Sequence, residues 1–370
     1  MTNLDTQLIQ GTNRTEDAST GAIVPPLYFS TAFRHPGLGE STGYDYSRVT
    51  TPTRALLEQQ LAAIEHGTQA FAVSSGMATI DLVFSTFTRS GDAIIASDDL
   101  YGGTFRYFDT RRDNYNIPYT TWNGQDVNDL VAQLTPATKL IWLESPSNPT
   151  MKVLDIAAVA QAVHAVRPDV LIAVDNTFLT PVYQQPLTLG ADLVVHSATK
   201  YLGGHNDLLA GAVVVADPAL GAKLAAQLTT TGQTLAPFDS WLLLRSLKTL
   251  GVRMRAHTAN AQFLAQKLAA LPGVAKLLYA GVGGMISFYL ADGYSVDAFL
   301  RGLHVCSFAE SLGSVETLVT VPAVQTHHDM PEKQRLALGI TPQLIRVSVG
   351  LEDQGDLLAD LTQAIAGAKA

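Results

Sequence analysis

Short apolar runs alternate with segments of helical periodicity between about residues 70 and 235. The runs are AFAVSS (70–75), DAIIAS (92–97), KLIWLESP (139–146), VLIAVDN (170–176), ADLVVHSATK (191–200) and AGAVVVAD (210–217). Each run has the length and the branched side chains that are typical of a strand buried on both faces. Alternation of such strands with helices predicts an α/β fold with a mostly parallel sheet.

The segments before this region follow a different pattern. Residues 1–45 have no clear helical or strand period and include the Pro-rich apolar stretch GAIVPPLYFS. They predict an extended arm that lies on another surface. A helix is then predicted to begin at Pro52, with Thr51 as its N-cap and Gly67 as the C′ residue beyond its end.

The pattern changes again after Gly232. The sequence predicts a long helix bent at Gly251, two strands and a last helix, at residues 240–271, 284–290, 343–351 and 353–368. These elements predict a smaller C-terminal α+β domain. The predicted parts of the chain are an N-terminal arm (1–48), a large domain (49–235) and a small domain (236–370).

Composition indicates that the chain buries an unusual amount of surface. It has 370 residues, of which 47% are hydrophobic and 15% are charged, and its mean hydropathy is +0.15. These values favour an obligate subunit interface, although many buried parallel strands would also raise the hydrophobic fraction and the mean hydropathy. The net charge of −9 argues against nucleic acid or an anionic membrane as the main partner.

The cysteine content and the N-terminus bear on location. Cys306 is the single cysteine, which excludes an internal disulfide. The polar start of the sequence does not resemble a signal peptide, and no apolar run approaches the ~20 residues that span a bilayer. We therefore expect a reducing, cytoplasmic location without a membrane anchor.

Residues with chemical potential follow several predicted strands. Ser74 to Met77 (SSGM) precede a helix, so they form either an ordinary turn or an anion site of backbone N–H groups. Asp175 is either a turn residue or a carboxylate that keeps a cofactor's ring nitrogen protonated. Lys200 points either to solvent or into a cavity, where partial burial would lower its pKa and make it nucleophilic toward aldehydes.

Two further side chains extend this set. Tyr101 is either a packed aromatic or a ring that stacks on a cofactor and transfers protons. Arg346, inside the apolar run LIRVSVG, forms either a structural salt bridge or the fork that binds a substrate carboxylate. Because ligands bind at the carboxyl ends of parallel strands, the combination fits pyridoxal phosphate. Lys200 would bind its aldehyde and Asp175 its ring nitrogen. Ser75 and Gly76 would bind its phosphate, and Tyr101 would cover its ring face.

Eight segments resemble the Cys/Met-metabolism pyridoxal-phosphate enzymes, which include cystathionine γ-synthases, cystathionine β- and γ-lyases and homocysteine-forming sulfhydrylases. The segments are YDYSRVTTPTR, SSGM, YGGT, ESPSNP, VDNTF, SATKYLGGH, FAESLGSVET and IRVSVGLED. They occur in the family's order from about residue 20 to 360, so the resemblance covers nearly the whole chain. It implies a type I aminotransferase-like fold and homotetramers, built as dimers of dimers, whose active sites are shared between subunits.

The resemblance also implies roles for individual residues. Lys200 would bind the cofactor covalently and act in catalysis together with Tyr101, which stacks on the ring, while Asp175 pairs with the ring nitrogen. The phosphate would be bound by Ser75, Gly76, Met77, Ser197 and Thr199, joined by Tyr46 and Arg48 of the neighbouring subunit. The amino-acid substrate would be bound by Asn148, Arg346, Ser311, Glu310 and Tyr46.

Two features bear on the reaction and on the cofactor loop. Glu310 resembles γ-synthases and γ-lyases, whereas β-lyases and methionine γ-lyases carry an aromatic or aliphatic residue there, and its carboxylate would bind the distal amino group of cystathionine. The family's R-x-G-N-P-T-R reads Arg48-Val49-Thr50-Thr51-Pro52-Thr53-Arg54 here, which alters the loop but spares Tyr46 and Arg48. The short link from Val274 to Gly284 resembles a compact subgroup of bacterial γ-synthases.

We therefore expect a cystathionine γ-synthase that replaces the acyl group of O-acetyl- or O-succinyl-L-homoserine by cysteine, sulfide or another thiol in methionine biosynthesis. The alternatives are a cystathionine γ- or β-lyase and a non-catalytic regulatory protein on the same fold. A dinucleotide enzyme would need G-x-G-x-x-G and an NTPase a P-loop, and the sequence has neither. H-E-x-x-H is absent, and the adjacent His327 and His328 with one cysteine do not predict a metal site.

Overall fold

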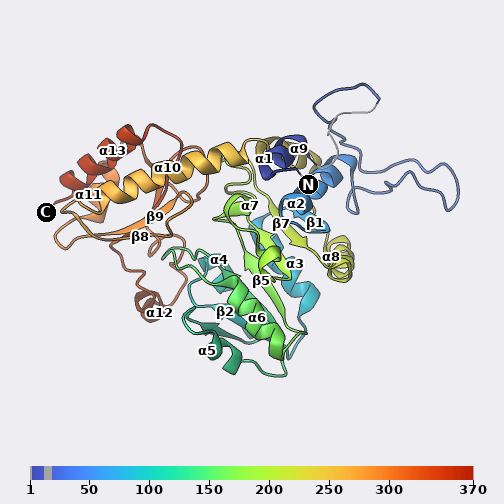
Figure 1. Ribbon diagram of the computed structural model, residues 1–370, viewed down its shortest axis with the longest axis horizontal. Helices are drawn as coiled ribbons and strands as arrows, with labels where there is room; N and C mark the ends of the chain where they lie inside the picture. Colours follow the sequence, from blue (N-terminus) through green and yellow to red (C-terminus); the bar gives the residue numbers. More distant parts are fainter. Residues whose placement is uncertain (1, 12–18, 370) are drawn as a thin grey trace. The chain divides into compact units, whose positions relative to one another are not determined.

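The computed structural model describes residues 2–11 and 19–369, and the chain forms two compact units. Unit 1 consists of residues 1–88 and 171–251, and unit 2 of residues 89–170 and 252–370. The chain therefore passes from one unit to the other three times. The colours in Figure 1 follow the sequence from the N-terminus to the C-terminus. The predicted division into arm, large domain and small domain stays a prediction.

Unit 1 contains a run of four paired strands in the order β1-β7-β6-β5. Its elements are α1 (Leu4–Gln10), α2 (Pro52–Ile64), β1 (Gln69–Val73), α3 (Gly76–Phe87), β5 (Leu171–Asp175), α7 (Thr180–Tyr183), a 3-10 turn (Pro186–Leu189), β6 (Leu193–His196), β7 (Gly211–Val215), α8 (Pro218–Thr231) and α9 (Pro237–Leu247). Strands β5 and β6 are parallel, whereas β7 is antiparallel to both β6 and β1. All residues of β6 and β7 are buried, as the apolar runs predict.

Helix α2 begins where the sequence predicts it. The Thr51 hydroxyl accepts the Arg54 backbone N–H at 3.2 Å, so the N-cap is confirmed. The predicted C′ residue is wrong by one position, because His66 adopts the left-handed conformation at φ 60° and Gly67 follows it. Gly67 is instead required by packing, since a Cβ there would lie 2.4 Å from Val214 Cγ1.

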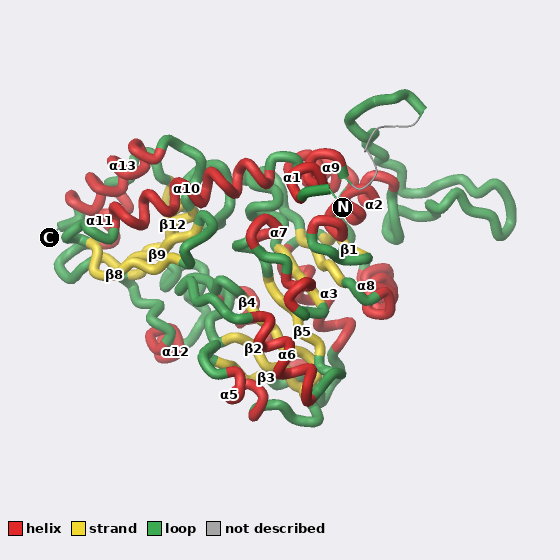
Figure 2. The backbone as a smooth tube through the Cα atoms, viewed as in Figure 1, coloured by secondary structure: helices red, strands yellow, loops and turns green. Residues whose placement is uncertain are grey.

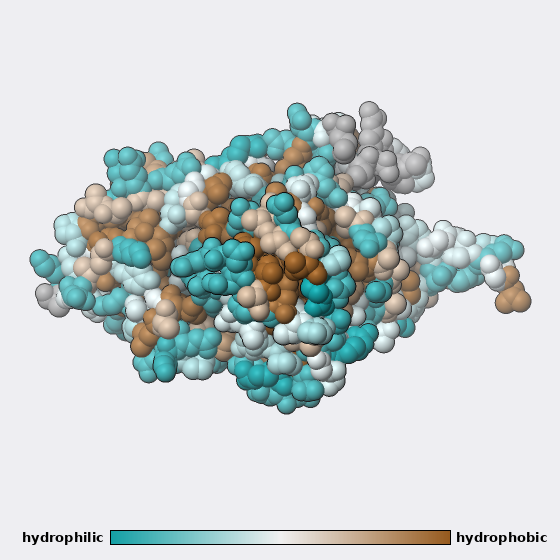
Figure 3. All heavy atoms as spheres, turned by 60° about the horizontal axis from the view of Figure 1, so that its bottom comes forward, coloured by the Kyte–Doolittle hydropathy of each residue, from teal (hydrophilic) through white to brown (hydrophobic). Residues whose placement is uncertain are grey.

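The N-terminal segment contains one short helix that the pattern did not predict. Helix α1 buries a single large apolar side chain, Leu8, and this is too little to produce a visible period. Residues 19–50 contain no helix or longer strand and form an extended, projecting segment, called the arm below (Figure 2). Its side chains include Ile23, which is 80% exposed, and Leu38, which is fully exposed. Figure 3 shows hydrophobic atoms at the tip of this projecting segment.

Unit 2 contains three parallel strands and a separate five-stranded sheet. The parallel strands have the order β4-β2-β3, and the second sheet has the order β10-β11-β12-β9-β8. The first part of the unit consists of β2 (Ala93–Ser97), α4 (Gly102–Tyr115), β3 (Tyr119–Trp122), α5 (Val127–Ala132), β4 (Thr138–Glu144) and α6 (Ile156–Val166). The second part consists of α10 (Leu250–Leu268), β8 (Val274–Tyr279), β9 (Met285–Leu290), α11 (Val296–Arg301), β10 (Ser307–Phe308), β11 (Leu318–Thr320), α12 (Glu332–Ala337), β12 (Leu344–Ser348) and α13 (Gln354–Gly367).

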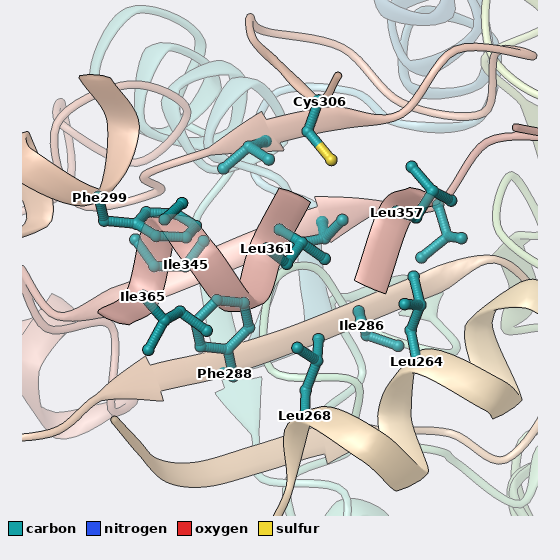
Figure 4. Close-up of a cluster of buried hydrophobic side chains, with 14 of the residues drawn as sticks. Leu264, Leu268, Ile286, Phe288, Phe299, Cys306, Ile345, Leu357, Leu361 and Ile365 are labelled. Carbon is teal, nitrogen blue, oxygen red and sulfur yellow. The ribbon is translucent and has the colours of Figure 1, made fainter. Parts of the chain in front are cut away.

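The second sheet of unit 2 has its own hydrophobic core. Side chains of β9 and β12 pack against α10, α11 and α13, with Phe288 and Phe299 in edge-to-face contact (Figure 4). The strands and the last helix confirm the predicted smaller α+β part. The single long helix predicted for residues 240–271 is wrong, because the chain forms α9 and α10 with a break at Lys248 and Thr249. None of the helices in the described ranges combines the length and apolar character needed to cross a membrane.

Candidate active site

Two chain segments of unit 1 meet at the start of α3. The Ser75 hydroxyl caps this helix by accepting the Ala78 N–H at 3.1 Å. A Cβ on Gly76 would lie 2.7 Å from both Cβ and Oγ of Ser197, so only glycine allows this approach. The approach places the N–H groups of the first turn, from Gly76 and Met77 onward, beside a second hydroxyl. Such a helix start is suited to bind a phosphate.

Asp175 lies at the carboxyl end of β5 and is held by Thr177. Thr177 donates to Asp175 Oδ1 from its N–H at 3.0 Å and from its hydroxyl at 2.5 Å. The same hydroxyl accepts the Ser197 N–H at 2.9 Å, which links Asp175 to the residue beside Gly76. Burial raises the pKa of Asp175, and the two Thr177 hydrogen bonds oppose that rise. The carboxylate is therefore best stabilised by a further positive group.

Lys200 follows β6 within a compact turn. Strands β5 and β6 are neighbours, with Asp175 opposite Val195, so both candidate side chains lie at the ends of adjacent parallel strands as predicted. The Lys200 N–H donates to Ser197 O at 3.1 Å, and the Lys200 carbonyl accepts the Gly204 N–H at 2.7 Å. Lys200 is half-buried. The glycine that ends the turn is thus explained, since Gly204 has φ 75°.

Thr199 is positioned differently from the other hydroxyls of this region. Its Oγ1 donates to the Ala210 carbonyl at 3.1 Å and accepts the Ala210 N–H at 3.0 Å. The hydroxyl therefore joins the Lys200 turn to the residue that precedes β7. A role in phosphate binding stays a prediction for this residue.

A buried polar network lies behind the ends of β5 and β6. Glu65 Oε1 lies 2.6 Å from His196 Nε2 and accepts the Asn176 side-chain N–H at 3.0 Å. Asn176 also donates to the carbonyl of Gln184 at 2.8 Å. His196 and Asn176 come directly before Ser197 and directly after Asp175, so the network fixes both strand ends. Sequence reasoning missed it, because its members are far apart in the chain.

Tyr46 and Arg48 lie in the loop before α2. The Arg48 guanidinium lies over the Tyr46 ring, 5.5 Å from its centroid, and donates to the carbonyl of Thr229. Arg54 donates from its two terminal nitrogens to Ser47 O at 2.9 Å and Val49 O at 2.8 Å. Arg54 is only 2% exposed, so this loop is fastened from within the unit. Within the altered Val49-Thr50-Thr51 stretch, Thr51 still caps helix α2.

In unit 2, Glu144 contacts both Tyr101 and Asn148. Its Oε2 accepts the Tyr101 N–H at 2.9 Å and its Oε1 accepts the Asn148 N–H at 3.1 Å. Glu144 ends β4, and Tyr101 precedes α4. One buried carboxylate therefore sets the backbone positions of the predicted ring-stacking residue and of a predicted carboxylate-binding residue. The motif ESPSNP contained this glutamate, but its partners could not be read from the sequence.

Arg346 lies within β12, is almost fully buried, and contacts Asn148. Its terminal nitrogens donate to Asn148 Oδ1 at 3.0 Å, Ser311 O at 2.9 Å and Thr320 Oγ1 at 3.0 Å. These contacts fix the orientation of the planar guanidinium fork. Glu310 precedes Ser311 in an exposed loop position. The group of Asn148, Arg346 and Ser311 is therefore suited to bind a carboxylate.

Comparisons with known proteins agree with this geometry. The family model of "Cys/Met metabolism PLP-dependent enzyme" matches residues 5–366. The chain is 48% identical over 366 residues to a cystathionine gamma-synthase/O-acetylhomoserine (thiol)-lyase of Bacillus subtilis (strain 168), covering 99% of this chain and 97% of that protein. It is 44% identical over 381 residues to a cystathionine beta-lyase of Lactococcus lactis subsp. cremoris (strain MG1363), covering 99% of each.

A solved structure extends the likeness to the fold. The cystathionine gamma-lyase of Lactobacillus plantarum, complexed with L-serine, superimposes with a TM-score of 0.96 at 43% identity, covering 99% of both chains. Synthases and lyases are thus similar to this chain at comparable identity, and the fold class predicted from the sequence is confirmed. The chain belongs to the Cys/Met metabolism family of enzymes that depend on pyridoxal phosphate (PLP), and it acts in sulfur amino-acid metabolism.

Proposed function

We propose that this enzyme is a cystathionine γ-synthase, which replaces the acyl group of an O-acyl-L-homoserine by the sulfur of L-cysteine, with sulfide as a second donor. The observation that supports γ-chemistry is the position of Glu310, an exposed carboxylate next to Ser311, whose carbonyl contacts Arg346. A substrate carboxylate bound by Arg346 leaves a distal amino group free to meet Glu310. The relative from Bacillus subtilis, named for both activities, supports the same reaction.

The residues of unit 1 fit PLP. The start of α3 has its first-turn N–H groups and a glycine packed against Ser197, which supports phosphate binding by Ser75, Gly76, Met77, Ser197 and Thr199. Tyr46 and Arg48 would complete that site from a neighbouring subunit. When bound, PLP supplies an aldehyde for amino groups and an electron sink for bonds to Cα.

Three side chains would perform the proton transfers and tune the cofactor. Lys200 Nζ would hold the aldehyde of the cofactor and would accept the Cα proton of the substrate. Asp175 would keep the ring nitrogen protonated, since burial raises the pKa of this carboxyl and a protonated ring nitrogen facing it would stabilise the carboxylate. Tyr101 covers the ring face and assists in proton transfer.

The residues of unit 2 would bind the amino-acid part of the substrate. Arg346 and Asn148 hold the carboxylate together with Ser311, and Glu310 binds the distal ammonium of cysteine or cystathionine. Sulfide has no amino group, so it makes no use of Glu310. This difference between the two thiol donors provides a test.

The test offers purified enzyme O-acetyl- or O-succinyl-homoserine with cysteine or with sulfide, and cystathionine alone. We expect consumption of an ester and formation of cystathionine or homocysteine. Glu310→Gln should lower kcat/KM for cysteine about 10-fold, the loss of one charge-assisted hydrogen bond, while the rate with sulfide stays unchanged. Glu332→Gln, at an exposed position of α12, is the matched control. Equal effects of Glu310→Gln on both donors would contradict this role.

The second candidate is a cystathionine lyase, favoured by the likeness to the gamma-lyase of Lactobacillus plantarum. A γ-lyase releases 2-oxobutanoate from cystathionine, and a β-lyase releases pyruvate. Rapid release of either product with little use of the homoserine esters would replace the synthase proposal by this one. Glu310 would serve a γ-lyase equally well, because cystathionine carries the same distal ammonium.

We also propose a cytoplasmic homotetramer, a dimer of dimers whose sites are shared. Its support is the arm, where Ile23 and Leu38 expose apolar side chains that another subunit would cover. The single cysteine and the reducing chemistry of thiol substrates suit the cytoplasm.

A further inference from the structure

The loop between β11 and α12 contains two adjacent histidines in opposite environments. His327 is completely buried, whereas the side chain of His328 is 62% exposed and contacts Asp329 at 2.7 Å. The sequence indicated only a loop here, and none of the roles proposed above uses either residue. A fully buried polar ring in a loop requires specific hydrogen-bond partners.

The partners of His327 are two backbone carbonyls, that of the proposed site residue Asn148 and that of Leu100, the residue before Tyr101. Its Nε2 lies 3.0 Å from the carbonyl oxygen of Leu100 and 3.2 Å from that of Asn148. Carbonyls only accept, so Nε2 carries the proton, and Nδ1 can then accept from the Thr326 hydroxyl at 2.8 Å. Burial lowers the pKa of His327 to about 4, which keeps this ring neutral at ordinary pH.

Glu144 contacts the same two segments through their N–H groups. It accepts from Tyr101, whose peptide bond begins at Leu100, and from Asn148, as described above. Each segment is thus held at its carbonyl by His327 and at its N–H by Glu144. Both side chains are buried, so water does not compete for these hydrogen bonds.

Packing of the loop onto the start of α4 is an independent observation. A Cβ on Gly102 would lie 1.9 Å from the carbonyl oxygen of Thr326 and 3.3 Å from His327 Cα. The residue after Tyr101 is therefore glycine because the loop occupies the space of a side chain. The Tyr101 side chain makes no capping hydrogen bond in α4, so its backbone contacts fix its position.

We propose that His327 and Glu144 are positioning residues that set the separation between the ring-stacking Tyr101 and the carboxylate-binding Asn148. This inference rests on the roles given to Tyr101 and Asn148 in the proposed function. Asn148 is in turn joined to Arg346 through its side chain. A substrate bound at Arg346 is thereby aligned with the cofactor face that Tyr101 covers, and misalignment of this kind lowers rates strongly.

The test compares His327→Leu and His327→Gln with the control His328→Leu, all in the full-length protein. The first readout is amide hydrogen exchange of peptides that contain Tyr101 and Asn148, measured with and without PLP. We expect at least 10-fold faster exchange in His327→Leu, since a lost buried hydrogen bond is worth a factor of this order. His327→Gln retains an N–H donor and should recover part of the protection, and His328→Leu should match the wild type.

The second readout separates positioning from folding. For His327→Leu we expect kcat/KM to fall about 10²-fold, with weaker binding of the amino-acid substrate and PLP affinity within about 2-fold of wild type. Unchanged exchange at both amides would show that the carbonyl contacts of His327 do not hold the two segments in place, and would overturn its positioning role. Faster exchange with unchanged substrate binding and rates would overturn the positioning role.

Glu144→Gln serves if His327→Leu does not fold. Glutamine has one acceptor oxygen, so only one of the two amides should lose protection. Equal protection of both amides, or equal loss at both, would contradict the arrangement. None of these readouts depends on the product formed, so a lyase result would change the proposed reaction and leave this inference standing.

Discussion

Arg54 joins α2 to the loop that carries Tyr46 and Arg48. Besides the carbonyls of Ser47 and Val49, its Nε lies 3.4 Å from Glu58, which also accepts the Ala72 N–H at 3.0 Å. Burial raises the pKa of Glu58 to about 7, and the nearby guanidinium opposes that rise. Removing the charge of Arg54 would therefore affect both the loop and the helix.

We predict that Arg54→Lys weakens PLP binding about 10-fold while keeping most of the folding stability. Lysine can still pair with Glu58, but it lacks the fork that reaches two carbonyls, so the loop loses its fixed shape. Arg54→Met should also lose about 3–5 kcal/mol of unfolding free energy, because a buried carboxyl is left without its partner. Fluorescence titration with PLP and urea unfolding measure the two effects. The exposed Arg301→Met is the control, and wild-type PLP affinity in Arg54→Lys would refute the loop argument.

We predict that Gly76→Ala weakens PLP binding by about 10-fold or more. The added methyl group would overlap Ser197 and fill the place proposed for the phosphate. Gly367→Ala is matched to it, because a Cβ at Gly367 meets no atom within 4 Å and its φ is not positive. Titration of the cofactor-free proteins with PLP gives the affinities. Equal affinities of the two variants would place the phosphate elsewhere.

At the scale of elements, His257 of α10 contacts the end of the β12 segment. Its Nδ1 lies 2.7 Å from the carbonyl oxygen of Val349, and the side chain is fully buried. Burial lowers the pKa of His257 to about 4, from an ordinary value of 6.5. Between these values the unfolded chain binds a proton that the folded chain excludes, so this residue makes stability fall as the pH drops.

We predict that the wild type loses about 1–2 kcal/mol of unfolding free energy relative to His257→Gln between about pH 7.5 and pH 5. Glutamine can still donate to Val349 but does not titrate. Urea unfolding of both proteins at each pH gives the difference, in which contributions from other groups cancel. The exposed His304→Gln should show no such change, and a pH-independent difference for His257→Gln would disprove the prediction.

The strands could be predicted from sequence, whereas several helix limits could not. Strands such as β7 are buried on both faces, so an unbroken apolar run suffices to reveal them. The break between α9 and α10 leaves no such trace, because Lys248 and Thr249 stand in an otherwise regular helical pattern. The left-handed residue after α2 is His66 where the pattern favoured Gly67, since β7 decides where glycine is needed.

The candidate site also divides into residues that the sequence indicates and residues that it does not. Residues that would touch the cofactor, such as Lys200 and Asp175, stand in motifs at strand ends, so the sequence alone suffices to propose them. It does not suffice for Thr177, Glu144 and His327, because their value lies in hydrogen bonds to backbone groups. Some of those partners are close in sequence, as Asn148 is to Glu144, but others are as distant as Leu100 is from His327. Only the folded chain brings them together.

At the scale of the whole molecule, the exposed apolar side chains of the arm are the reason for which we expect a homotetramer. We predict a mass of four times 39.5 kDa by light scattering. Substitution of Ile23 and Phe29 by serine should yield smaller species with weaker PLP binding, because the arm would cover a neighbouring subunit. Val166→Ser, exposed in α6, is the control. A monomeric wild type, or an arm variant with unchanged mass and PLP affinity, would exclude the shared site.

The threefold passage of the chain between the two units has a consequence for synthesis on the ribosome. Unit 1 has all of its residues once residue 251 has emerged, so it can fold while translation continues. The three parallel strands of unit 2 are made earlier, within residues 89–170, but the rest of that unit comes last. A nascent chain that stalls at about residue 251 therefore lacks the second sheet of unit 2 and its helices, and the part of that unit already made would expose apolar side chains to chaperones and proteases.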